Sequence, residues 1–485
     1  MPNPVRWLLL SIGRLLARAG LIDARRAERT TDLAWPRIVT GIARMSKSAA
    51  DVAMVGLALG SGAIAGVGYA SPFWGMAFAL GGGFAGATIS LVSQRYGADA
   101  YDRLSLAVKT SAVVVLAVTT PVAVLFALAP HELISLIGSG STPIEYGATY
   151  LRVVALGVPF AGLNLVGSRT LVGADDAWTP MVLRAGGAVI NVGLNAILIF
   201  GAGMGVVGAA VGTVVANVAV FGAFVWGFSA GSLPLVGAFP VTVDLSGPHA
   251  TLDEVRDVVE IGVPLVFTNS AATMAQFPML AIVGLFGQNV VAAFVVARRV
   301  RALMDTPNWG FSLASSSLVG QELGAGDEDD AGRLGHEIIS FSVAVYLAIA
   351  GAVLVLADPI GSLFVSDPEV KPLTTAFIAV ACISVVFRGV SGGATGPLRA
   401  SGDTRWPFYA QLLGLYAFTL PIAYAGAASV PIPVIGAVTP LGIEALYLAL
   451  VVETLVPAVV TYYRFATGRW KAISRSYRPE ASAGD

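Results

Sequence analysis

The sequence predicts an all-α integral membrane protein, with twelve transmembrane helices in two pseudo-symmetric lobes of six helices each. Of its 485 residues, 56% are hydrophobic and 12% are charged, and the mean hydropathy is +0.77. Soluble proteins carry roughly 25% charged residues, so the lipid bilayer is the expected solvent. The apolar runs are long and continuous, as membrane helices of about 20 residues require. Membrane strands would instead alternate apolar and polar residues over about ten positions.

The division into two lobes follows from motifs that recur at one offset. Gln94 and Gln321 each end a long apolar stretch, and 321 − 94 = 227. Asp176 and Asp403 each follow a later apolar stretch, and 403 − 176 = 227. Two matches at one offset indicate a duplication, which is the usual construction of transporters. Because each half holds an even number of helices, we expect a parallel repeat with its two-fold axis along the membrane normal.

The apolar stretches divide the chain into five regions. These are an N-terminal segment 1–34, an N-lobe 35–230, a cytoplasmic connector 231–257, a C-lobe 258–466 and a cytoplasmic tail 467–485. A capping box over 251–254 is expected to begin the second half. The twelve helices are expected at 36–60, 68–95, 103–129, 145–172, 180–200, 204–229, 258–286, 291–322, 335–357, 371–399, 406–428 and 440–465.

The first 34 residues differ from the rest of the chain. Hydrophobic residues such as Trp7 alternate with arginines such as Arg14, and the apolar run is too short to span a membrane. This pattern favours an amphipathic helix in the membrane interface over a cleaved signal peptide.

Lysine and arginine in the loops set the expected orientation. Arg95, Arg399 and Arg475 mark cationic connections and the cationic tail, whereas four loops on the opposite side contain neither residue. Both termini are therefore expected in the cytoplasm. We also expect the chain to lie in the plasma membrane of a prokaryote. The acidic run 327–330 breaks the trend and is interpreted as a solvated loop, because acidic residues count little in this rule.

An ionisable residue inside a membrane helix is a functional candidate, because burial of its charge is costly. Asp51 is the clearest case, with Lys47 four residues earlier on the same helical face. Burial favours the protonated carboxyl group and Lys47 favours the ionised one, so the balance would suit a proton-binding carboxylate. The alternative is an ion pair that only holds the helices together.

Two other helices repeat the four-residue spacing. Asn191 and Asn195 share a face of the fifth helix, and Thr213 and Asn217 share a face of the sixth. Together with Asp51, these side chains would offer carboxylate, amide and hydroxyl oxygens to a proton or a sodium ion. The alternative is that they only join neighbouring helices, for about 1 kcal/mol or less each.

The second half carries different charges. The position equivalent to Asp51 is 51 + 227 = 278, and it is occupied by Pro278. Glu453 in the twelfth helix and Asp305 in the eighth are alternative proton sites. A structural role is favoured for both acids because nearby arginines can neutralise them, namely Arg298, Arg299, Arg301 and Arg388.

Other kinds of chemistry are disfavoured. Cys382 is the single cysteine, which rules out an internal disulfide, and the three histidines lie far apart in the sequence. We therefore expect no cofactor and no resident metal, and we expect a monomer in the lipid bilayer with no nucleic-acid partner. Pro36 is expected in the first turn of the first helix, where it could bend the helix that carries Asp51.

Several motifs together resemble the multidrug and toxic compound extrusion (MATE) family, particularly its archaeal and DinF-type branch. They are Asp51 with Val55-Gly56, the segments 91–98 and 319–326, the segment 398–404, and Gly205 to Thr213. The resemblance covers about residues 36–465 and implies two six-helix lobes in a V shape. It also implies that Asp51, Asn191, Asn195 and Thr213 form the cation site of the N-lobe, with Asn195 in place of an aspartate of the family.

The resemblance implies a secondary active transporter, and not an enzyme. It would export amphipathic, often cationic organic compounds in exchange for protons or sodium ions by alternating access. One alternative is a flippase for lipid-linked oligosaccharides or other lipids in the same superfamily, with arginines of the second half on its pyrophosphate. Another is a membrane transferase, which would need clustered acids for a metal. The pair Asp175-Asp176 is interpreted instead as helix-end structure.

Overall fold

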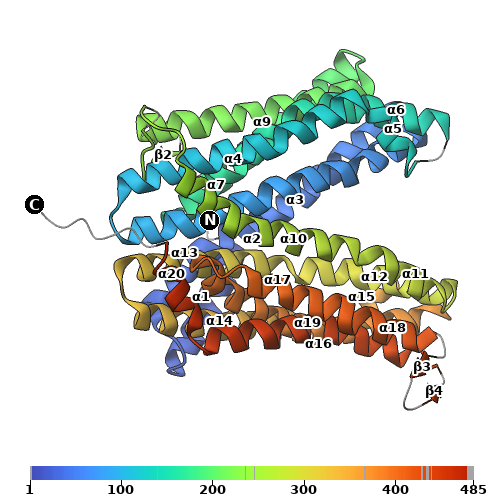
Figure 1. Cartoon of the computed structure of the whole chain (residues 1–485). Coiled ribbons are helices and arrows are strands. Elements are labelled where there is room, and N and C mark those ends of the chain that lie inside the picture. Colours follow the sequence, from blue (N-terminus) through green and yellow to red (C-terminus); the bar gives the residue numbers. More distant parts are fainter. Residues whose placement is uncertain are drawn as a thin grey trace, which may run out of the picture. The chain divides into compact units, whose positions relative to one another are not determined.

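The computed structural model describes residues 3–138, 140–234, 236–244, 246–364, 368–427, 430–432, 436–438 and 440–477. Long helices dominate this part of the chain (Figure 1). Ten of the described helices are long and apolar enough to cross a membrane. The expected all-α membrane fold is therefore confirmed. Residues 478–485 of the expected tail lie outside the described residues.

The first half follows the expected helix ranges closely, except at its N-terminus. The fourth expected helix consists of two α-helices joined by a short 3-10 turn, and the fifth ends in a π-helical turn. The elements are α1 (Pro4–Arg18), α2 (Ala24–Leu59), α3 (Ser61–Gly97), α4 (Tyr101–Leu128), α5 (Pro130–Ser135), α6 (Ser141–Val154), η1 (Ala155–Gly157), α7 (Val158–Gly173), α8 (Trp178–Ala196), η2 (Ile197–Gly201) and α9 (Gly205–Ala230).

The second half also has interrupted helices, together with two short antiparallel hairpins. β1 (Ser232–Leu233) pairs with β2 (Gly237–Ala238), and β3 (Val430–Ile432) pairs with β4 (Gly436–Val438). The helices are α10 (Leu252–Met274), α11 (Gln276–Gly284), α12 (Gln288–Met304), α13 (Thr306–Ala325), α14 (Glu328–Val355), α15 (Ala357–Phe364), α16 (Val370–Ala400), α17 (Arg405–Leu412), η3 (Leu413–Thr419), α18 (Leu420–Ala427), α19 (Glu444–Ala466) and α20 (Arg469–Ser474).

The duplication is visible in where the helices begin and end. α4 starts at 101 and α14 at 328, and 328 − 101 = 227. These two helices end at 128 and 355, again 355 − 128 = 227. α8 and α17 begin at 178 and 405, and 405 − 178 = 227. The two halves therefore share a helix plan as well as short motifs.

Backbone conformation repeats at the same offset. Three pairs of residues, each pair 227 positions apart, have positive φ angles at the ends of helices. Such angles favour glycine, yet aspartate takes them twice in the first half. The pairs are Gly60 (81°) with Gly287 (95°), Asp99 (53°) with Gly326 (90°), and Asp175 (69°) with Gly402 (85°).

The described chain forms two compact units. The N-unit contains residues 36–266, 324–326 and 477–485, and the C-unit contains 1–35, 267–323 and 327–476. The V-shaped arrangement of two lobes and the expected domain bounds stay predictions.

Among the described helices, α2 and α10 each pass from one unit to the other close to an internal proline. α2 crosses between Trp35 and Pro36, and α10 crosses just after Val266, with Pro264 inside the helix. Pro36 therefore lies inside α2, and its expected place in the first turn is wrong. The helix begins twelve residues earlier, at Ala24, because residues 24–35 are docked on the C-unit.

Two of the expected spans are less apolar than the other ten. These are α2 and the pair α12–α13, which are absent from the ten apolar spans found among the described residues. α2 carries Lys47 and Asp51, and α12 carries Arg301 next to Asp305. Asp51 and Arg301 thus lie on the least apolar helices of their halves, whereas Glu453 lies on α19, which is one of the ten apolar spans.

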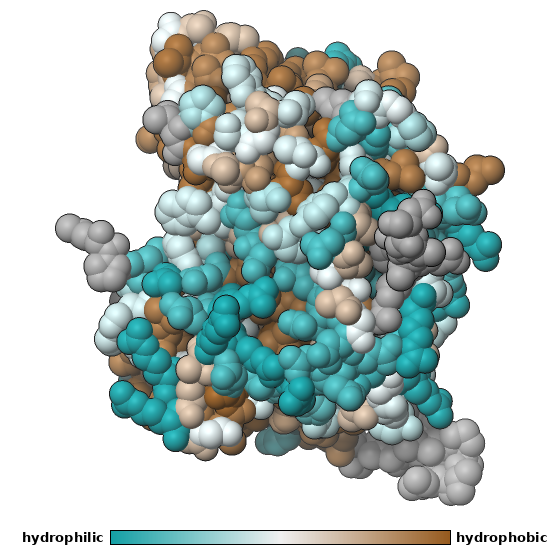
Figure 2. Space-filling view, turned by 90° about the vertical axis from the view of Figure 1, so that its left-hand side faces the viewer, coloured by the Kyte–Doolittle hydropathy of each residue, from teal (hydrophilic) through white to brown (hydrophobic). Residues whose placement is uncertain are grey.

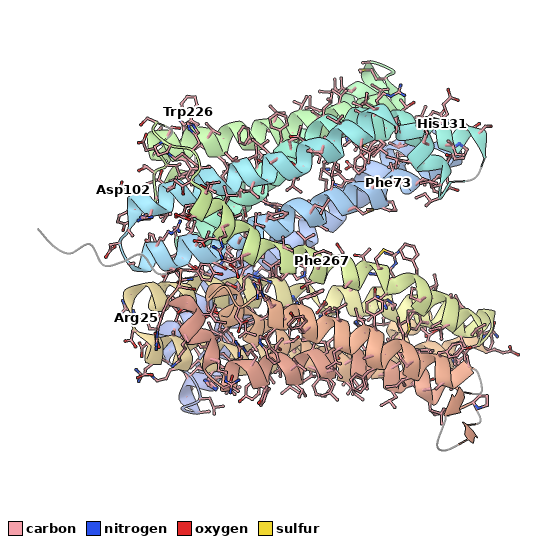
Figure 3. The ribbon with its side chains drawn as sticks, in the orientation of Figure 1. Arg25, Phe73, Asp102, His131, Trp226 and Phe267 are labelled. Carbon is pink, nitrogen blue, oxygen red and sulfur yellow. The ribbon has the colours of Figure 1, made fainter. Side chains whose placement is uncertain are left out.

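Successive membrane-spanning segments of the N-unit run in alternate directions (Figure 3). Figure 3 shows Asp102, at the start of α4, and Trp226, near the end of α9, toward one end of this unit. His131, which follows α4, lies toward the other end. This alternation is the arrangement that consecutive membrane-crossing helices require.

Helices of the N-unit approach one another closely at glycines. A Cβ atom on Gly66 of α3 would lie 2.8 Å from the backbone nitrogen of Gly147 in α6, and 2.6 Å from the carbonyl oxygen of Pro143. A Cβ atom on Gly68, one of the next residues of α3, would meet nothing within 4 Å. Small residues at the interface are how membrane helices pack backbone to backbone.

The connector packs onto the N-unit. Phe239, Val241 and Val243 are buried in its main hydrophobic core, and Lys109 donates a 2.8 Å hydrogen bond to the carbonyl oxygen of Ser246. Thr251 Oγ1 accepts a 3.4 Å hydrogen bond from the backbone nitrogen of Glu254, which is half of the expected capping box.

The Glu254 side chain does not complete the capping box. It forms a buried ion pair with Arg95, at 2.8 Å between Arg95 Nη2 and Glu254 Oε1. Both side chains are only 5% exposed. This pair ties the start of α10 to the end of α3.

The N-terminal segment is attached to the C-unit. α1 packs against α14, with Leu9 and Gly13 buried, while Trp7 and Leu15 are exposed. Arg26 donates to Glu337 at 2.9 Å and to Asp330 at 2.8 Å. The exposed side chains of Trp7 and Leu15 are available to contact lipid, and the membrane-interface position of this segment stays a prediction.

The acidic run 327–330 is not a solvated loop, as the sequence suggested, but the start of α14. Asp327 caps this helix by accepting from the backbone nitrogen of Asp330 at 2.8 Å. Glu328 pairs with Arg475 at 2.7 Å and Asp329 with Lys471 at 3.4 Å. Figure 2, which views the left-hand end of Figure 1, shows hydrophilic residues gathered on this face. The run thus anchors both terminal segments of the chain.

Candidate functional site

Asp51 lies between a cation from its own helix and an amide from another helix. Lys47 Nζ is 2.8 Å from Asp51 Oδ2, and Asn195 Nδ2 donates to Asp51 Oδ1 at 2.9 Å. The Lys47 and Asp51 side chains are 25% and 16% exposed, so the ion pair is partly shielded from solvent. Each oxygen of the carboxylate therefore has one partner, and the two partners come from α2 and α8.

The polar residues expected on the fifth and sixth helices continue from Asp51 as one hydrogen-bonded chain. Asn195 Nδ2 lies 3.4 Å from Asn191 Oδ1, and Asn191 Nδ2 donates to Thr213 Oγ1 at 3.1 Å. The Thr213 hydroxyl in turn donates to the carbonyl oxygen of Ala209 at 3.0 Å. The structure thus brings together Asp51, Asn191, Asn195 and Thr213, as the sequence predicts.

Asn217 lies beside this chain rather than within it. Its side-chain amide donates to the carbonyl oxygen of Thr213 at 2.8 Å. The backbone carbonyl oxygen of Asn217 accepts a 3.0 Å hydrogen bond from Asn164 Nδ2 of α7. Asn217 therefore connects the cluster to a fourth helix.

Sequence reasoning missed three residues of this site. Asn164 is one, and its position in an apolar helix is a signal that could have identified it. Tyr150 of α6 is the second; it contacts Thr213 and lies within electrostatic range of Asp51. Gly212 is the third, because a Cβ atom there would overlap Asn195 Oδ1.

The geometry around Asn195 leaves it one unused acceptor. Its side chain is fully buried, and its Oδ1 atom has no hydrogen-bond partner in the structure. The α-helix that carries it changes to the π-helical turn η2 only two residues later. π-helical turns inside α-helices occur frequently at functional sites. An unsatisfied carbonyl oxygen next to a carboxylate is suited to a positively charged or proton-donating ligand.

The acids of the second half are neutralised by arginines. Glu453 forms a two-pronged ion pair with Arg301, at 2.5 and 3.0 Å. Asp305 pairs with Arg388 at 3.2 Å rather than with Arg301, its neighbour on the same helical face. Both alternative proton sites are thus held as ion pairs within the C-unit, at a site separate from the Asp51 cluster.

The duplicated aspartates have taken different roles. Asp176 Oδ1 accepts from the backbone nitrogen of Thr179 at 2.9 Å and caps α8, so its interpretation as helix-end structure is confirmed. Its equivalent, Asp403, instead accepts from Arg464 at 2.6 Å.

Comparison with known proteins identifies the family. The MatE family model matches the chain twice, over residues 36–197 and 264–425, and the matches start 264 − 36 = 228 residues apart. This second match is independent support for the duplication. The probable multidrug resistance protein YoeA of Bacillus subtilis is 24% identical over 399 residues, covering 80% of this chain and 84% of YoeA.

Two further relatives cover still more of the chain. The probable multidrug resistance protein NorM of Thermotoga maritima is 24% identical, over 90% of this chain and 92% of NorM. A solved outward-facing structure of a multidrug resistance MATE family transporter of the MOP superfamily has a TM-score of 0.81 at 21% identity. The match covers 92% of this chain and 96% of the chain in that structure. The archaeal and DinF-type branch stays a prediction. Because the family model covers more than half of the chain, in two copies, the protein belongs to the MatE family of multi-pass membrane transporters.

Proposed function

We propose that this protein exports amphipathic organic compounds across the plasma membrane of a prokaryote in exchange for protons. The observation that carries the proposal is the position of Asp51, a partly shielded carboxylate whose two oxygens contact its own helix α2 and the helix α8. Such a group can change its contacts when it gains or loses a proton. The names of YoeA and NorM as multidrug resistance proteins support organic compounds as the cargo.

A proton fits this site better than a sodium ion. Sodium prefers several oxygen ligands and more than one negative charge, in the manner of other hard cations. Within the cluster, Asp51 is the one carboxylate, and the Lys47 ammonium already lies against its Oδ2 atom. A second cation at this carboxylate would be repelled by Lys47, whereas a proton would release Lys47.

The coupling follows from what protonation does to these contacts. The ionised carboxylate holds Lys47 by charge and Asn195 by a charge-assisted hydrogen bond. A protonated Asp51 loses most of both attractions, so α2 is freed to shift relative to α8. Pro36, inside α2, provides the place where this helix can bend. Protons would thereby bias the two states of alternating access by differential binding.

The remaining features of the proposal come from the sequence. The cationic connections favour a cytoplasmic location for both termini, and nothing in the proposal requires more than one copy of the chain.

The test replaces Asp51 by asparagine, which keeps the size of the side chain and removes its charge. Ethidium efflux from vesicles is measured under a proton gradient and, separately, under a sodium gradient. Asp51→Asn should abolish proton-driven efflux and leave folded protein in the membrane. Asp102→Asn, an exposed carboxylate at the start of α4, is the matched control and should behave as wild type. Full proton-driven efflux by Asp51→Asn would move the coupling site elsewhere, and efflux driven by sodium alone would replace the proton as coupling ion.

The two alternative functions have weaker support. Arg301 and Arg388, which could bind the pyrophosphate of a lipid-linked sugar, are engaged by Glu453 and Asp305. A metal-dependent transferase would need clustered acids. Among the described residues there is no group of three or more histidines, cysteines, aspartates and glutamates that could hold a metal ion.

A further inference from the structure

The N-terminal helix α1 has one exposed face that mixes apolar and cationic side chains. Its exposed residues recur every three or four positions and so share one side of the helix, namely Pro4, Trp7, Leu8, Arg14, Leu15 and Arg18. The side chains of Trp7 and Leu15 are 62% and 66% exposed. The opposite side is buried on α14, where a Cβ atom on Gly13 would lie 3.4 Å from the ring of Phe341.

The six arginines of the N-terminal segment divide into two groups. Three of them bind partners within the C-unit at 2.7 to 2.9 Å, namely Arg6 with Asp32, Arg26 with Asp330 and Arg29 with Gln321. Arg14, Arg18 and Arg25 are exposed and form no hydrogen bond or ion pair within the part of the chain that the structure describes. Figure 3 shows Arg25 toward one end of the C-unit.

The helix α14, on which the segment docks, indicates its level in the bilayer. Residues 338–355 of this apolar span contain no charged side chain, and 355 − 337 = 18. Eighteen helical residues are about 27 Å long, close to the roughly 30 Å of the hydrocarbon core. The core therefore begins near Glu337. Arg26 contacts Glu337 itself, and Phe341 lies about one turn further along, so the segment lies where the lipid head groups begin.

The composition of the exposed face fits this boundary. The exposed apolar residues of α4, such as Val124 and Leu128, have no charged residue among them, as contact with acyl chains requires. On α1, by contrast, Arg14 adjoins Leu15. A guanidinium group needs phosphate or water and an apolar side chain needs acyl chains, and only the membrane interface offers both.

We propose that the exposed face of α1, together with Arg25 at the start of α2, binds anionic phospholipids of the bilayer beside α14. Arg14, Arg18 and Arg25 bind the head-group phosphates, and Trp7 and Leu15 enter the acyl chains. The charge of the segment is complementary to such lipids, because its six arginines face only three acidic residues. The proposal goes beyond the proposed function, since it depends on neither the cargo nor the coupling ion.

The test measures which lipid lies next to α1 in the full-length protein. The buried Cys382 is removed as Cys382→Ala, and a bimane label is attached through Ala19→Cys at the exposed end of α1. The protein is placed in phosphatidylcholine nanodiscs that contain a small fraction of nitroxide-labelled phosphatidylglycerol or, separately, nitroxide-labelled phosphatidylcholine. One arginine near an anionic surface gives roughly a fivefold preference. Quenching by the labelled phosphatidylglycerol should therefore exceed quenching by the labelled phosphatidylcholine by roughly fivefold or more.

Two triple variants separate the segment from the total charge of the protein. The first carries Arg14→Gln, Arg18→Gln and Arg25→Gln, and it should quench almost equally with both lipids while it remains folded. The second removes the same charge from exposed positions outside the segment and should keep the preference; it carries Arg103→Gln, Arg152→Gln and Arg256→Gln. Trp7→Ala should weaken quenching by both lipids in proportion, because it removes an apolar anchor and no charge.

Four outcomes would overturn the inference. Equal quenching of the wild type by the two lipids would exclude charge recognition, and a preference that survives the first triple variant would exclude these arginines. A preference abolished by soluble glycerol phosphate would assign them to a free anion instead of a lipid. Quenching by neither lipid would show that α1 faces water or another protein.

Discussion

Gly212 of α9 makes room for the amide that contacts Asp51, so alanine at this position should disable the site. A Cβ atom there would overlap Asn195 Oδ1 outright, and it would lie 3.2 Å from Asn195 Cγ and 3.3 Å from Asn195 N. Ordinary contacts between carbon atoms are about 3.5 Å or longer. The amide must therefore move by at least about 1 Å, and the short distance to the backbone nitrogen means that α8 must shift with it.

The size of the effect follows from the bond that this movement breaks. Asn195 Nδ2 now lies 2.9 Å from Asp51 Oδ1, and a displacement of this size takes the pair beyond hydrogen-bond distance. A hydrogen bond to a charged group contributes about 1.5–3 kcal/mol, which corresponds to a factor of roughly ten to one hundred in an equilibrium constant. We expect proton-driven efflux to fall by roughly tenfold or more.

The assay measures initial rates of ethidium efflux from vesicles under an imposed proton gradient. Gly222→Ala is the matched control, because it lies on the same helix and its added Cβ atom would meet nothing within 4 Å. Thermal unfolding of the purified variants shows whether each one is folded. A folded Gly212→Ala protein that transports at the wild-type rate would refute the role assigned to Asn195.

Three further predictions test separate contacts. Lys47→Ala removes the cation that lies 2.8 Å from the Asp51 carboxylate, so protonation of Asp51 becomes easier. The pH dependence of efflux should therefore move to higher pH. An unchanged pH profile would contradict a functional role for the ion pair. Glu254→Ala leaves Arg95 buried without its partner and should cost about 3–5 kcal/mol in the free energy of unfolding, whereas replacing both residues by leucine should recover most of it, as a double-mutant cycle would measure. Gly66→Ala should lower stability by about 1–3 kcal/mol through backbone overlap and Gly68→Ala should not, as thermal unfolding would show; equal losses would contradict the close approach of the helices.

Most of the Asp51 cluster could be predicted because its members repeat a helical spacing. Asn191 and Asn195 are four residues apart, so they had to share a face of one helix, and a carboxylate nearby was the natural partner. Tyr150 and Gly212 could not be found in this way. Their roles depend on which helices pack together and how closely, and no local pattern encodes that.

Two errors of the sequence reading, at Pro36 and at the acidic run 327–330, have one physical cause. A proline after a polar segment usually starts a helix, but Pro36 lies inside α2 because Arg26 and its neighbours dock the earlier turns on α14. An acidic run usually lies in solvent, but Glu328 finds Arg475, 147 positions later in the chain. In both cases ion pairs between distant residues decide the local structure, and such partners cannot be identified from neighbouring sequence.

The attachment of the N-terminal segment to α14 sets an order for the assembly of the chain in the membrane. Arg26 is synthesised before its partners Asp330 and Glu337, which follow 304 and 311 residues later. At 5–20 residues per second, the ribosome needs roughly 15 to 60 seconds to reach them. During that time α1 has no docking surface, and its exposed Trp7 and Leu15 can rest on the bilayer while the first half inserts. Residues 4–35 are therefore synthesised long before they reach their final place, so docking of this segment reports that the second half has been built.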